Sequence, residues 1–391
     1  MLDRLDQQPP DALLALIKLY EADPRPTKID LGVGVYRTSD GATPVFAAIK
    51  AAEAKLVAEQ PSKAYLGPEG DMGFVHALVP HVFGDAGDMG GRIDGMQTPG
   101  GTGAVRVAAG LAKKAGVAKV LMGTPSWPNH AQIFADLAMD TVGFDHRASD
   151  GSANMDALRT ALQNADKGDA VLLHGCCHNP SGIDYTPAQW DEIVDLLVER
   201  EILPIVDLAY QGLGDGMDED AYGLRKVVAS VPEALIAYSC DKNFGLYRDR
   251  VGAFYALGKT SDDTARIMSN GCALARANWS MPPDHGAAAV GLILNDEALT
   301  AQWLEELTSM RARIGEVRSE LAAAGKAGSV DLAPLGEQKG MFAMLPLTKD
   351  QIGALRSDHG VYMAGSGRIN VAGLTSGNIG NFVKALEAVS G

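Results

Sequence analysis

Hydrophobic positions along the chain fall into short apolar runs separated by amphipathic stretches. The runs are rich in Val, Ile and Leu and are bordered by Gly, Pro or Asp, a pattern that predicts buried strands. The predicted strands are 118–123, 170–175, 202–207, 234–239 and 252–257. Between them, 103–116 and 187–200 have the spacing of helices. This alternation predicts an α/β fold with parallel pairing and helices on both faces of the sheet.

The pattern changes in the last part of the chain. An amphipathic helix is expected from about 300 to 325, where it ends at a glycine. Shorter elements follow, and the clearest predicted strands there are 340–347 and 367–373. We therefore expect a change of domain near residue 310, which agrees with a length of 391 residues, enough for two or three domains.

Composition and charge narrow the class of protein. Hydrophobic residues make up 46% of the 391 positions and charged residues 21%, as in ordinary globular proteins. The 34 basic and 49 acidic residues give a net charge of −15, which argues against a broad surface for nucleic acid or anionic membrane. No apolar run approaches the roughly 18 residues that a membrane span needs.

The expected location is the cytoplasm. The first 25 residues contain acidic side chains and an amphipathic stretch, unlike a secretion signal, which is basic and then apolar. The four cysteines, at 176, 177, 240 and 272, form neither a CxxC pair nor a disulfide framework. Such a pattern favours a soluble protein in a reducing compartment.

A glycine-rich turn, TPGGTGAVR at 98–106, opens a predicted helix. The backbone N–H groups at a helix start favour anions, and Thr102 adds a hydroxyl. The turn does not match the dinucleotide pattern GxGxxG, because Arg106 stands in place of the third glycine, and it lacks the GK[ST] ending of a nucleotide P-loop. A tight turn with a helix cap is the alternative, but a small phosphate site is the better functional interpretation.

The segment LHGCCHNPSG at 173–182 follows a predicted strand. His174 and His178 are four residues apart, which on a helix would suggest metal ligands, but the strand before them and Pro180 after them argue against a helix. No metal site is therefore expected. The adjacent cysteines are interpreted as core residues. Asn179 is the candidate for contact with a ligand.

Two further strand ends carry candidate chemistry. Asp207 ends one strand, with Tyr210 just beyond, and a cap of the local backbone is the alternative role for this carboxylate. Lys242 follows another strand, where partial burial would lower the pKa of its amine and make it nucleophilic, although most lysines are simply solvated. The polar residues near Lys242 are Ser239, Asp241 and Arg250.

The strand ends of an open parallel sheet meet at one edge, so these groups are expected to lie together. A phosphate-binding turn, a lysine that can form an imine and a carboxylate that can keep a pyridine nitrogen protonated describe a site for pyridoxal phosphate. The protonated ring of this cofactor withdraws electrons from the α carbon of an amino acid.

At these residues the chain resembles the fold-type I pyridoxal-phosphate aminotransferases, and specifically the aspartate/aromatic aminotransferase family. Nine segments carry the resemblance in the family's order: IDLGVGVYR (29–37), AYLGPEG (64–70), TPGGTGAVR (98–106), PSWPNH (125–130), HGCCHNPSG (174–182), DLAYQG (207–212), KNFGLYRDR (242–250), RANWSMPP (276–283) and SGRINVAG (366–373). The resemblance implies a large domain over 44–309 with a mostly parallel sheet flanked by helices. A smaller α/β domain would combine 1–43 with 310–391.

The resemblance also implies how the cofactor is held. Lys242 would form the Schiff base and later move the proton between the α carbon and C4′ of the cofactor. Asp207 would pair with the pyridine nitrogen, supported by His130, and Trp127 would stack on the ring. Tyr210 would join Lys242 and Asp207 in catalysis.

Further contacts follow from the same resemblance. Asn179 and Tyr210 would hydrogen-bond the phenolic oxygen of the cofactor. The residues implied for the phosphate are Gly101, Thr102, Ser239, Arg250 and, from the second subunit of a homodimer, Tyr65.

For the substrate, the resemblance implies that Arg368 grips the α-carboxylate with a bidentate fork, which a lysine could not reproduce. Gly34 would lie on an N-terminal segment that closes over the site, and Trp127 and Asn179 would line it. Arg276 would reach the active site of the partner chain and bind a side-chain carboxylate, with Trp279 and Ser280 flanking that interface.

Three residues depart from the family pattern. Met281 replaces an asparagine or serine beside Arg276, and Ala64 replaces an asparagine next to Tyr65. Both changes remove polar groups near the pocket for the distal carboxylate and favour tolerance of aromatic substrates. Asp241 precedes Lys242 where a serine is usual, either as a hydrogen-bond acceptor at the sheet end or as a charge that raises the pKa of the imine.

The resulting functional prediction is an aminotransferase that moves the amino group of aspartate or aromatic L-amino acids to 2-oxoglutarate in a ping-pong cycle. A decarboxylase, lyase or racemase on the same cofactor site is the alternative. A cofactor-binding transcription regulator would need a fused helix-turn-helix region, and the resemblance begins near residue 10. The acidic charge also disfavours DNA, and no dinucleotide fingerprint supports a dehydrogenase.

Overall fold

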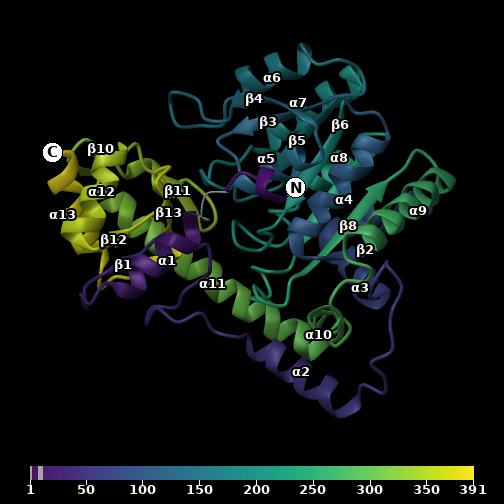
Figure 1. Cartoon of the computed structure of the whole chain (residues 1–391), viewed down its shortest axis with the longest axis horizontal. Coiled ribbons are helices and arrows are strands. Elements are labelled where there is room, and N and C mark those ends of the chain that lie inside the picture. Colours follow the sequence, from purple (N-terminus) through teal and green to yellow (C-terminus); the bar gives the residue numbers. More distant parts are fainter. Residues whose placement is uncertain (1, 8–11) are drawn as a thin grey trace. The chain divides into compact units, whose positions relative to one another are not determined.

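The structure is a computed structural model that describes residues 2–7 and 12–391. Met1 and residues 8–11, which belong to the N-terminal segment interpreted above as unlike a secretion signal, lie outside the described residues. Contacts divide the chain into a larger compact unit, Pro44–Arg313, and a smaller one, which combines Ile314–Gly391 with the described part of residues 1–43. Figure 1 follows the chain through both units. Within the described ranges, no helix is long and apolar enough to cross a membrane.

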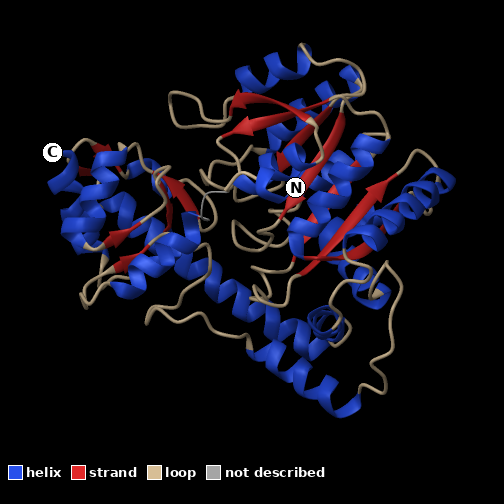
Figure 2. Ribbon diagram, in the orientation of Figure 1, coloured by secondary structure: helices blue, strands red, loops and turns tan. Residues whose placement is uncertain are grey.

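A seven-stranded sheet forms the centre of the larger unit (Figure 2). Its strands, in spatial order, are β2 (Ile93–Pro99), β8 (Val251–Leu257), β7 (Ala234–Ser239), β6 (Leu203–Leu208), β5 (Ala170–His174), β3 (Lys119–Thr124) and β4 (Asp140–Asp145). Neighbouring strands from β7 to β4 are parallel, whereas β8 runs antiparallel to both β7 and β2. The expectation of a mostly parallel α/β sheet is confirmed.

The expectation of parallel pairing is wrong for one predicted strand, β8. Only the loop 240–250 connects β7 to β8, and it contains turns but no helix. A parallel return needs a crossover of a dozen or more residues, usually with a helix, so the chain turns back antiparallel instead. Two strands of this sheet, β2 and β4, were not predicted from the sequence. β4 lies at the sheet edge with most of its residues exposed, so it carries no buried apolar run.

Helices cover the sheet of the larger unit. The helices of the larger unit are α2 (Ala47–Glu59), α3 (Met72–Phe83), α4 (Gly100–Lys114), α5 (Pro128–Asp136), α6 (Met155–Gln163), α7 (Pro187–Arg200), α8 (Tyr222–Ser230), α9 (Ser261–Asn278), α10 (His285–Leu294) and the first part of α11 (Glu297–Ala323), with a 3-10 turn at Gly84–Gly87. Helix α4 is almost wholly buried and packs on β7 and β8. Its small residues, four of them glycines, allow this close packing and place its first turn at the sheet edge.

The smaller unit is built from short elements. Its helices are α1 (Ala12–Ala22), the last part of α11, α12 (Lys349–His359) and α13 (Ile379–Ser390), with 3-10 turns at Leu2–Arg4, Ala333–Gly336 and Val371–Gly373. Its strands form three pairs: β1 (Ile29–Asp30) with β12 (Val361–Tyr362), β9 (Lys326–Ala327) with β10 (Val330–Asp331), and β11 (Phe342–Met344) with β13 (Arg368–Asn370). The two predicted strands of this region are present, but shorter than expected.

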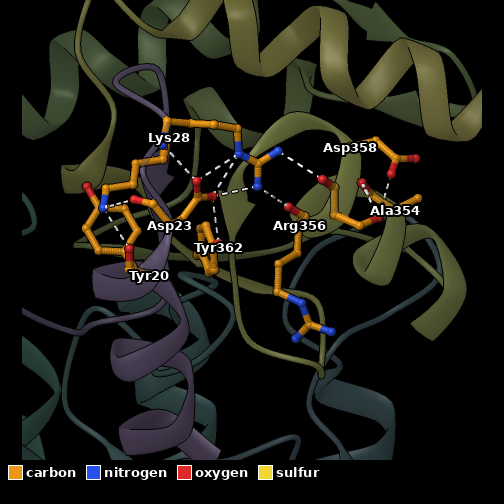
Figure 3. A network of polar contacts seen from close by, with 9 residues as sticks. Tyr20, Asp23, Lys28, Ala354, Arg356, Asp358 and Tyr362 are labelled. Carbon is orange, nitrogen blue, oxygen red and sulfur yellow. Dashed lines mark hydrogen bonds and ion pairs between the residues drawn. The ribbon is translucent and has the colours of Figure 1, made fainter.

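Arginine side chains join the short elements of the smaller unit. Arg25 donates to the carboxylate of Asp23 and to the carbonyls of Arg356 and Ser357 at the end of α12 (Figure 3). The hydroxyl of Tyr362 in β12 also donates to Asp23, at 2.7 Å. A cation at the last carbonyls of a helix complements its dipole. The network therefore holds the N-terminal segment against the end of α12.

Candidate active site

The carboxyl ends of the central strands bring the predicted residues to one edge of the larger unit. In the pairing register, His174 of β5 lies opposite Asp207 of β6, and Ser239 of β7 lies opposite Gly252 of β8. Lys242 follows β7 within three residues. The sequence-based expectation that these strand ends share one edge agrees with this register.

The glycine-rich turn joins the end of β2 to the start of α4. Gly100 begins the helix with φ = 67°, a conformation that favours glycine. A Cβ at Gly101 would lie 3.0 Å from Cβ of Ser239, so Gly101 faces the end of β7 at close range. The first N–H groups of a helix have no partner within it, and those of Gly101 and Thr102 belong to this turn. The turn can therefore receive an anion.

Arg250 lies beside the same turn and is held by two oxygen atoms. Its Nη1 donates to Oδ2 of Asp241 at 2.5 Å and to the carbonyl of Tyr247 at 3.1 Å. A Cβ at Gly100 would lie 2.5 Å from the Nη2 atom of Arg250, so the guanidinium contacts the turn. Asp241 also accepts from the backbone N–H of Val251 at 3.2 Å, which is the sheet-end acceptor role considered for it above.

Lys242 presents its amine to the ring of Tyr210. The Nζ atom lies 5.3 Å from the centroid of that ring. Part of the lysine surface stays open, yet the side chain is enclosed enough for burial to lower the pKa of its amine, against the opposing charges of Asp241 and Asp207. The hydroxyl of Tyr210 accepts from Nδ2 of Asn179 at 3.3 Å, so these two side chains form one group.

Asp207 is buried, and only one of its two carboxylate oxygens has a hydrogen-bond partner among the described residues. Its Oδ2 is 2.8 Å from Nε2 of His130, whereas Oδ1 has no hydrogen-bond partner among the described residues. Burial raises the pKa of Asp207, but the hydrogen bond from His130 and the nearby positive charges outweigh it, so the pKa is lowered. The carboxylate therefore stays ionised. The ring of Trp127 meets the His130 ring edge to face, with centroids 5.0 Å apart.

Sequence reasoning missed the hydrogen bonds behind His130. Ser126 places its Oγ 3.0 Å from Nδ1 of His130 and 3.1 Å from Nε2 of His174. Ser126 and His130 are four residues apart at the start of α5, a spacing that could have indicated the contact. His174, considered above only as a metal ligand, instead belongs to this chain of polar groups. Burial lowers its pKa to about 3, so it is neutral.

These residues fit pyridoxal phosphate. A buried carboxylate oxygen without a partner is costly, and a protonated ring nitrogen is the donor that Oδ1 of Asp207 lacks. Lys242 has an amine of lowered pKa that could react with the aldehyde. The α4 turn, Ser239 and Arg250 could hold the phosphate, and Asn179 with Tyr210 could bind the phenolic oxygen.

In the smaller unit, Gly34 and Arg368 meet at one aromatic ring. The guanidinium carbon of Arg368 lies 4.6 Å from the centroid of Phe342, and its Nη2 donates to the carbonyl of Gly32 at 2.7 Å. A Cβ at Gly34 would lie 2.9 Å from Cζ of Phe342, too close for a real side chain. Asn370 fixes the same segment by donating to the carbonyls of Val33 and Val35.

Arg276 and Tyr65 are exposed in the larger unit. The Arg276 Nη1 donates to Oγ of Ser280 at 2.7 Å. Met281 does interact with a polar group, because its Sδ accepts from the backbone N–H of Leu66 at 3.1 Å. Ser280 therefore supplies polar support to Arg276, which the argument from Met281 alone did not include. Tyr65 is 94% exposed.

Another group of potential ligands lies near Asn179. In the described part of the chain, the sulfur atoms of Cys176 and Cys177 and a carboxylate oxygen of Asp220 come within 4.8 Å of one another. Asp220 already accepts from the backbone N–H groups of Gly212, Gly214 and Asp215. Burial raises the pKa of the Cys176 thiol well above its ordinary value. The thiol of Cys176 is therefore protonated, and the carboxylate of Asp220 binds the backbone of its own loop.

Comparison with known families agrees with this geometry. Residues 26–386 match the family described as aminotransferase class I and II. The chain belongs to the aminotransferase class I and II family. It is a pyridoxal-phosphate-dependent transaminase, and the resemblance described from its motifs is confirmed.

Individual aminotransferases match along nearly the whole chain. A tyrosine aminotransferase from Rhizobium meliloti is 50% identical over 375 residues, which cover 96% of each chain. An aspartate aminotransferase from Escherichia coli is 42% identical over 395 residues, covering 100% of both. Among solved structures, an aromatic-amino-acid aminotransferase from Burkholderia pseudomallei, covalently bound to pyridoxal phosphate, has a TM-score of 0.95 at 34% identity and covers both chains completely.

Proposed function

We propose that this aminotransferase moves the amino group of aspartate or aromatic L-amino acids to 2-oxoglutarate, with cofactor and substrate alternating in a ping-pong cycle. The observation that carries the proposal is the partnerless, buried Oδ1 of Asp207 close to a lysine of lowered pKa. Relatives named for tyrosine and for aspartate support this choice of substrates.

The proposed chemistry assigns a distinct task to each residue of the larger unit. When bound, pyridoxal phosphate supplies an aldehyde that condenses with amines and a protonated ring that withdraws electrons from the α carbon. Lys242 would then be the base that takes the α proton, because a lowered pKa favours the unprotonated amine. Asp207 keeps the ring nitrogen protonated, and His130 holds Asp207 ionised. Trp127 excludes water from the ring face.

Substrate recognition is proposed to use two arginines. Arg368, with its guanidinium positioned by Phe342 and Gly32, would bind the α-carboxylate. Arg276 would bind the side-chain carboxylate of aspartate. Met281 offers a flexible apolar surface to an aromatic ring in the same pocket. We assign the cofactor to the domain predicted over 44–309 and Arg368 to the domain of 1–43 and 310–391.

We propose a homodimer in which each active site takes residues from both chains. Exposed apolar side chains support this assembly, since Tyr65 is 94% exposed, Leu2 81% and Leu5 74%. Tyr65 would donate to the phosphate bound by the partner, and Arg276 would reach the partner's substrate. A reducing cytoplasm is the proposed location, supported by four free cysteines.

A hybrid test addresses the shared site. Lys242→Ala and Arg276→Ala chains, each with its own affinity tag, are unfolded together, refolded and purified through both tags. If the sites are shared, one site of the hybrid has both Lys242 and Arg276 intact, so activity on aspartate returns. If Arg276 serves its own chain, both sites remain defective. Light scattering gives the mass of the wild-type assembly, and a monomer would contradict the proposal.

The reaction itself is tested by half-reactions. The purified holoenzyme is mixed with aspartate, phenylalanine or tyrosine, and the visible band of the cofactor is followed while the products are identified. Transamination predicts loss of the band with one 2-oxo acid formed per site, and its return with 2-oxoglutarate. Release of carbon dioxide or of the D-amino acid instead would favour the decarboxylase or racemase alternative.

A further inference from the structure

The carboxylate of Asp241 forms an ion pair with the guanidinium of Arg250, which contacts the anion-binding turn. The side chain of Asp241 is 3% exposed and that of Arg250 is 41% exposed, and 2.5 Å separates Oδ2 from Nη1. The same Oδ2 would lie 3.0 Å from a Cβ at Gly100. A fixed negative charge therefore stands directly at the turn that would receive a phosphate.

The contacts of Asp241 keep it in place. Its Oδ1 accepts from the backbone N–H of Val251 in β8, and its own N–H donates to Oγ of Ser239 at the end of β7. The carboxylate is thus anchored to β8, and the backbone of the same residue is held at the end of β7. Arg250 has the more exposed side chain of the pair.

We propose that Asp241 is an internal competitor for Arg250, which weakens the binding of the phosphate group of pyridoxal phosphate and keeps the cofactor exchangeable. The inference rests on the proposed function, in which Arg250, Ser239 and the α4 turn hold that phosphate. Arg250 and Asp241 together carry no net charge, so the turn must bind the phosphate largely through backbone N–H groups, hydroxyls and the helix dipole. An incoming phosphate must share Arg250 with Asp241 and is repelled by the carboxylate.

The consequence is a holoenzyme whose loading depends on the concentration of free cofactor. Asp241 acts here as a positioning residue, since it works through Arg250 and not on the reacting atoms. An alternative route would be through Lys242, because the charge of Asp241 also favours the protonated amine. The two routes differ in whether the phosphate is needed.

The test measures cofactor binding. Holoenzymes of the wild type and Asp241→Asn are equilibrated against decreasing pyridoxal phosphate, and the bound fraction is read from visible absorbance. Pyridoxal, which lacks the phosphate, is the control ligand. Asp145→Asn is the control variant, since it removes an equal charge from the end of β4 at the far edge of the sheet.

We expect Asp241→Asn to lower the dissociation constant for pyridoxal phosphate by at least about tenfold, about 1.4 kcal/mol, and to leave that for pyridoxal nearly unchanged. Asp241→Ser removes the same charge and serves if the asparagine variant does not fold. An equal or weaker affinity in these variants would overturn the inference, as would an equal gain for pyridoxal, which points to Lys242. Absence of a Lys242-bound cofactor in the wild type would instead refute the proposed function.

Discussion

His130 and Asp207 form a buried pair in which Nε2 of the histidine lies 2.8 Å from Oδ2 of the carboxylate. Because His130 binds only this oxygen, the other carboxylate oxygen, Oδ1, is free to accept a hydrogen bond from another donor. Ser126 holds the other side of the His130 ring, so its orientation is determined on both sides. One oxygen of Asp207 is thus used by His130, and the other is available to a further donor, which under the proposed function is the ring nitrogen of the cofactor.

Asp207→Asn should abolish most of the turnover while leaving the cofactor bound. The amide keeps the shape but cannot hold a ring nitrogen protonated, and a loss of about 4 kcal/mol, or about a thousandfold in kcat, is expected for a buried charge-assisted contact. Steady-state kinetics with aspartate should show this loss in kcat and a much smaller change in KM. An Asp207→Asn enzyme with most of its activity would mean that Asp207 is a structural cap.

Lys242 should react as an amine of lowered pKa. Burial is the main cause of the lowered value, so modification of Lys242 in cofactor-depleted protein should reach its plateau at a lower pH than that of exposed lysines such as Lys167. Reductive methylation followed by peptide mass analysis measures both sites in one sample. In the holoenzyme, borohydride should leave the cofactor on Lys242. Cofactor on another lysine would refute the assignment.

Substrate range depends on Arg276 and its support. Wild-type kcat/KM values for aspartate, phenylalanine and tyrosine are expected within about two orders of magnitude of one another, and a gap above about ten-thousandfold, about 5.5 kcal/mol, would exclude dual specificity. Arg276→Ala should strongly lower kcat/KM for aspartate and leave kcat/KM for phenylalanine nearly unchanged. Ser280→Ala removes the hydroxyl that holds the guanidinium. It should therefore also lower kcat/KM for aspartate more than for phenylalanine, but by a smaller factor than Arg276→Ala. Met281→Asn should shift the ratio toward aspartate.

Acid should destabilise the protein through its buried neutral histidines. Burial is the largest cause of the lowered pKa values of His146, His174 and His178, with a value of about 3 for His174. Because the folded pKa values lie below those of the unfolded chain, the unfolded state binds more protons as the pH falls below about 6.5. Each histidine then costs about 1.4 kcal/mol per pH unit over that window.

Denaturant unfolding of the holoenzyme between pH 7.5 and 5 checks this dependence. His146→Gln, which keeps a donor for the carbonyl of Ile183, should reduce the slope of the free energy of unfolding against pH by the contribution of one proton. His76→Gln, the same substitution at an exposed position, is the control variant. A wild-type stability that does not fall over this range would contradict the assignment.

Arg318 should be essential for the stability of the smaller unit. Its buried guanidinium donates to the carbonyls of Leu335, Lys339, Gly340 and Phe342. Arg318→Met would remove these hydrogen bonds, at a cost of about 3 kcal/mol or more in the free energy of unfolding. Lys326→Met, at an exposed position of the same unit, is the control. Thermal unfolding of both variants would measure the difference, and equal midpoints would refute this role.

Local sequence determined the elements that carry a strong signal in their own residues. The strand at 234–239 and the helix at 187–200 have the predicted bounds, because a continuous apolar run and a Thr186 cap followed by Pro187 are local signals. Motif order also indicated the family and the set of candidate residues around Lys242. These conclusions depend on residue types and their spacing, which can be read directly from the sequence.

Tertiary structure decided the features that depend on partners distant in sequence. The direction of β8 follows from the connection that precedes it, and β4 is held at the sheet edge by pairing with β3 despite an exposed surface. The contact of Asp241 with Arg250 and that of Ser126 with His174 could not be read from the chain, because hydrogen bonds of this kind require particular side-chain directions. Sequence thus determined which groups are available, and packing decided which of their atoms are used and which remain for the cofactor.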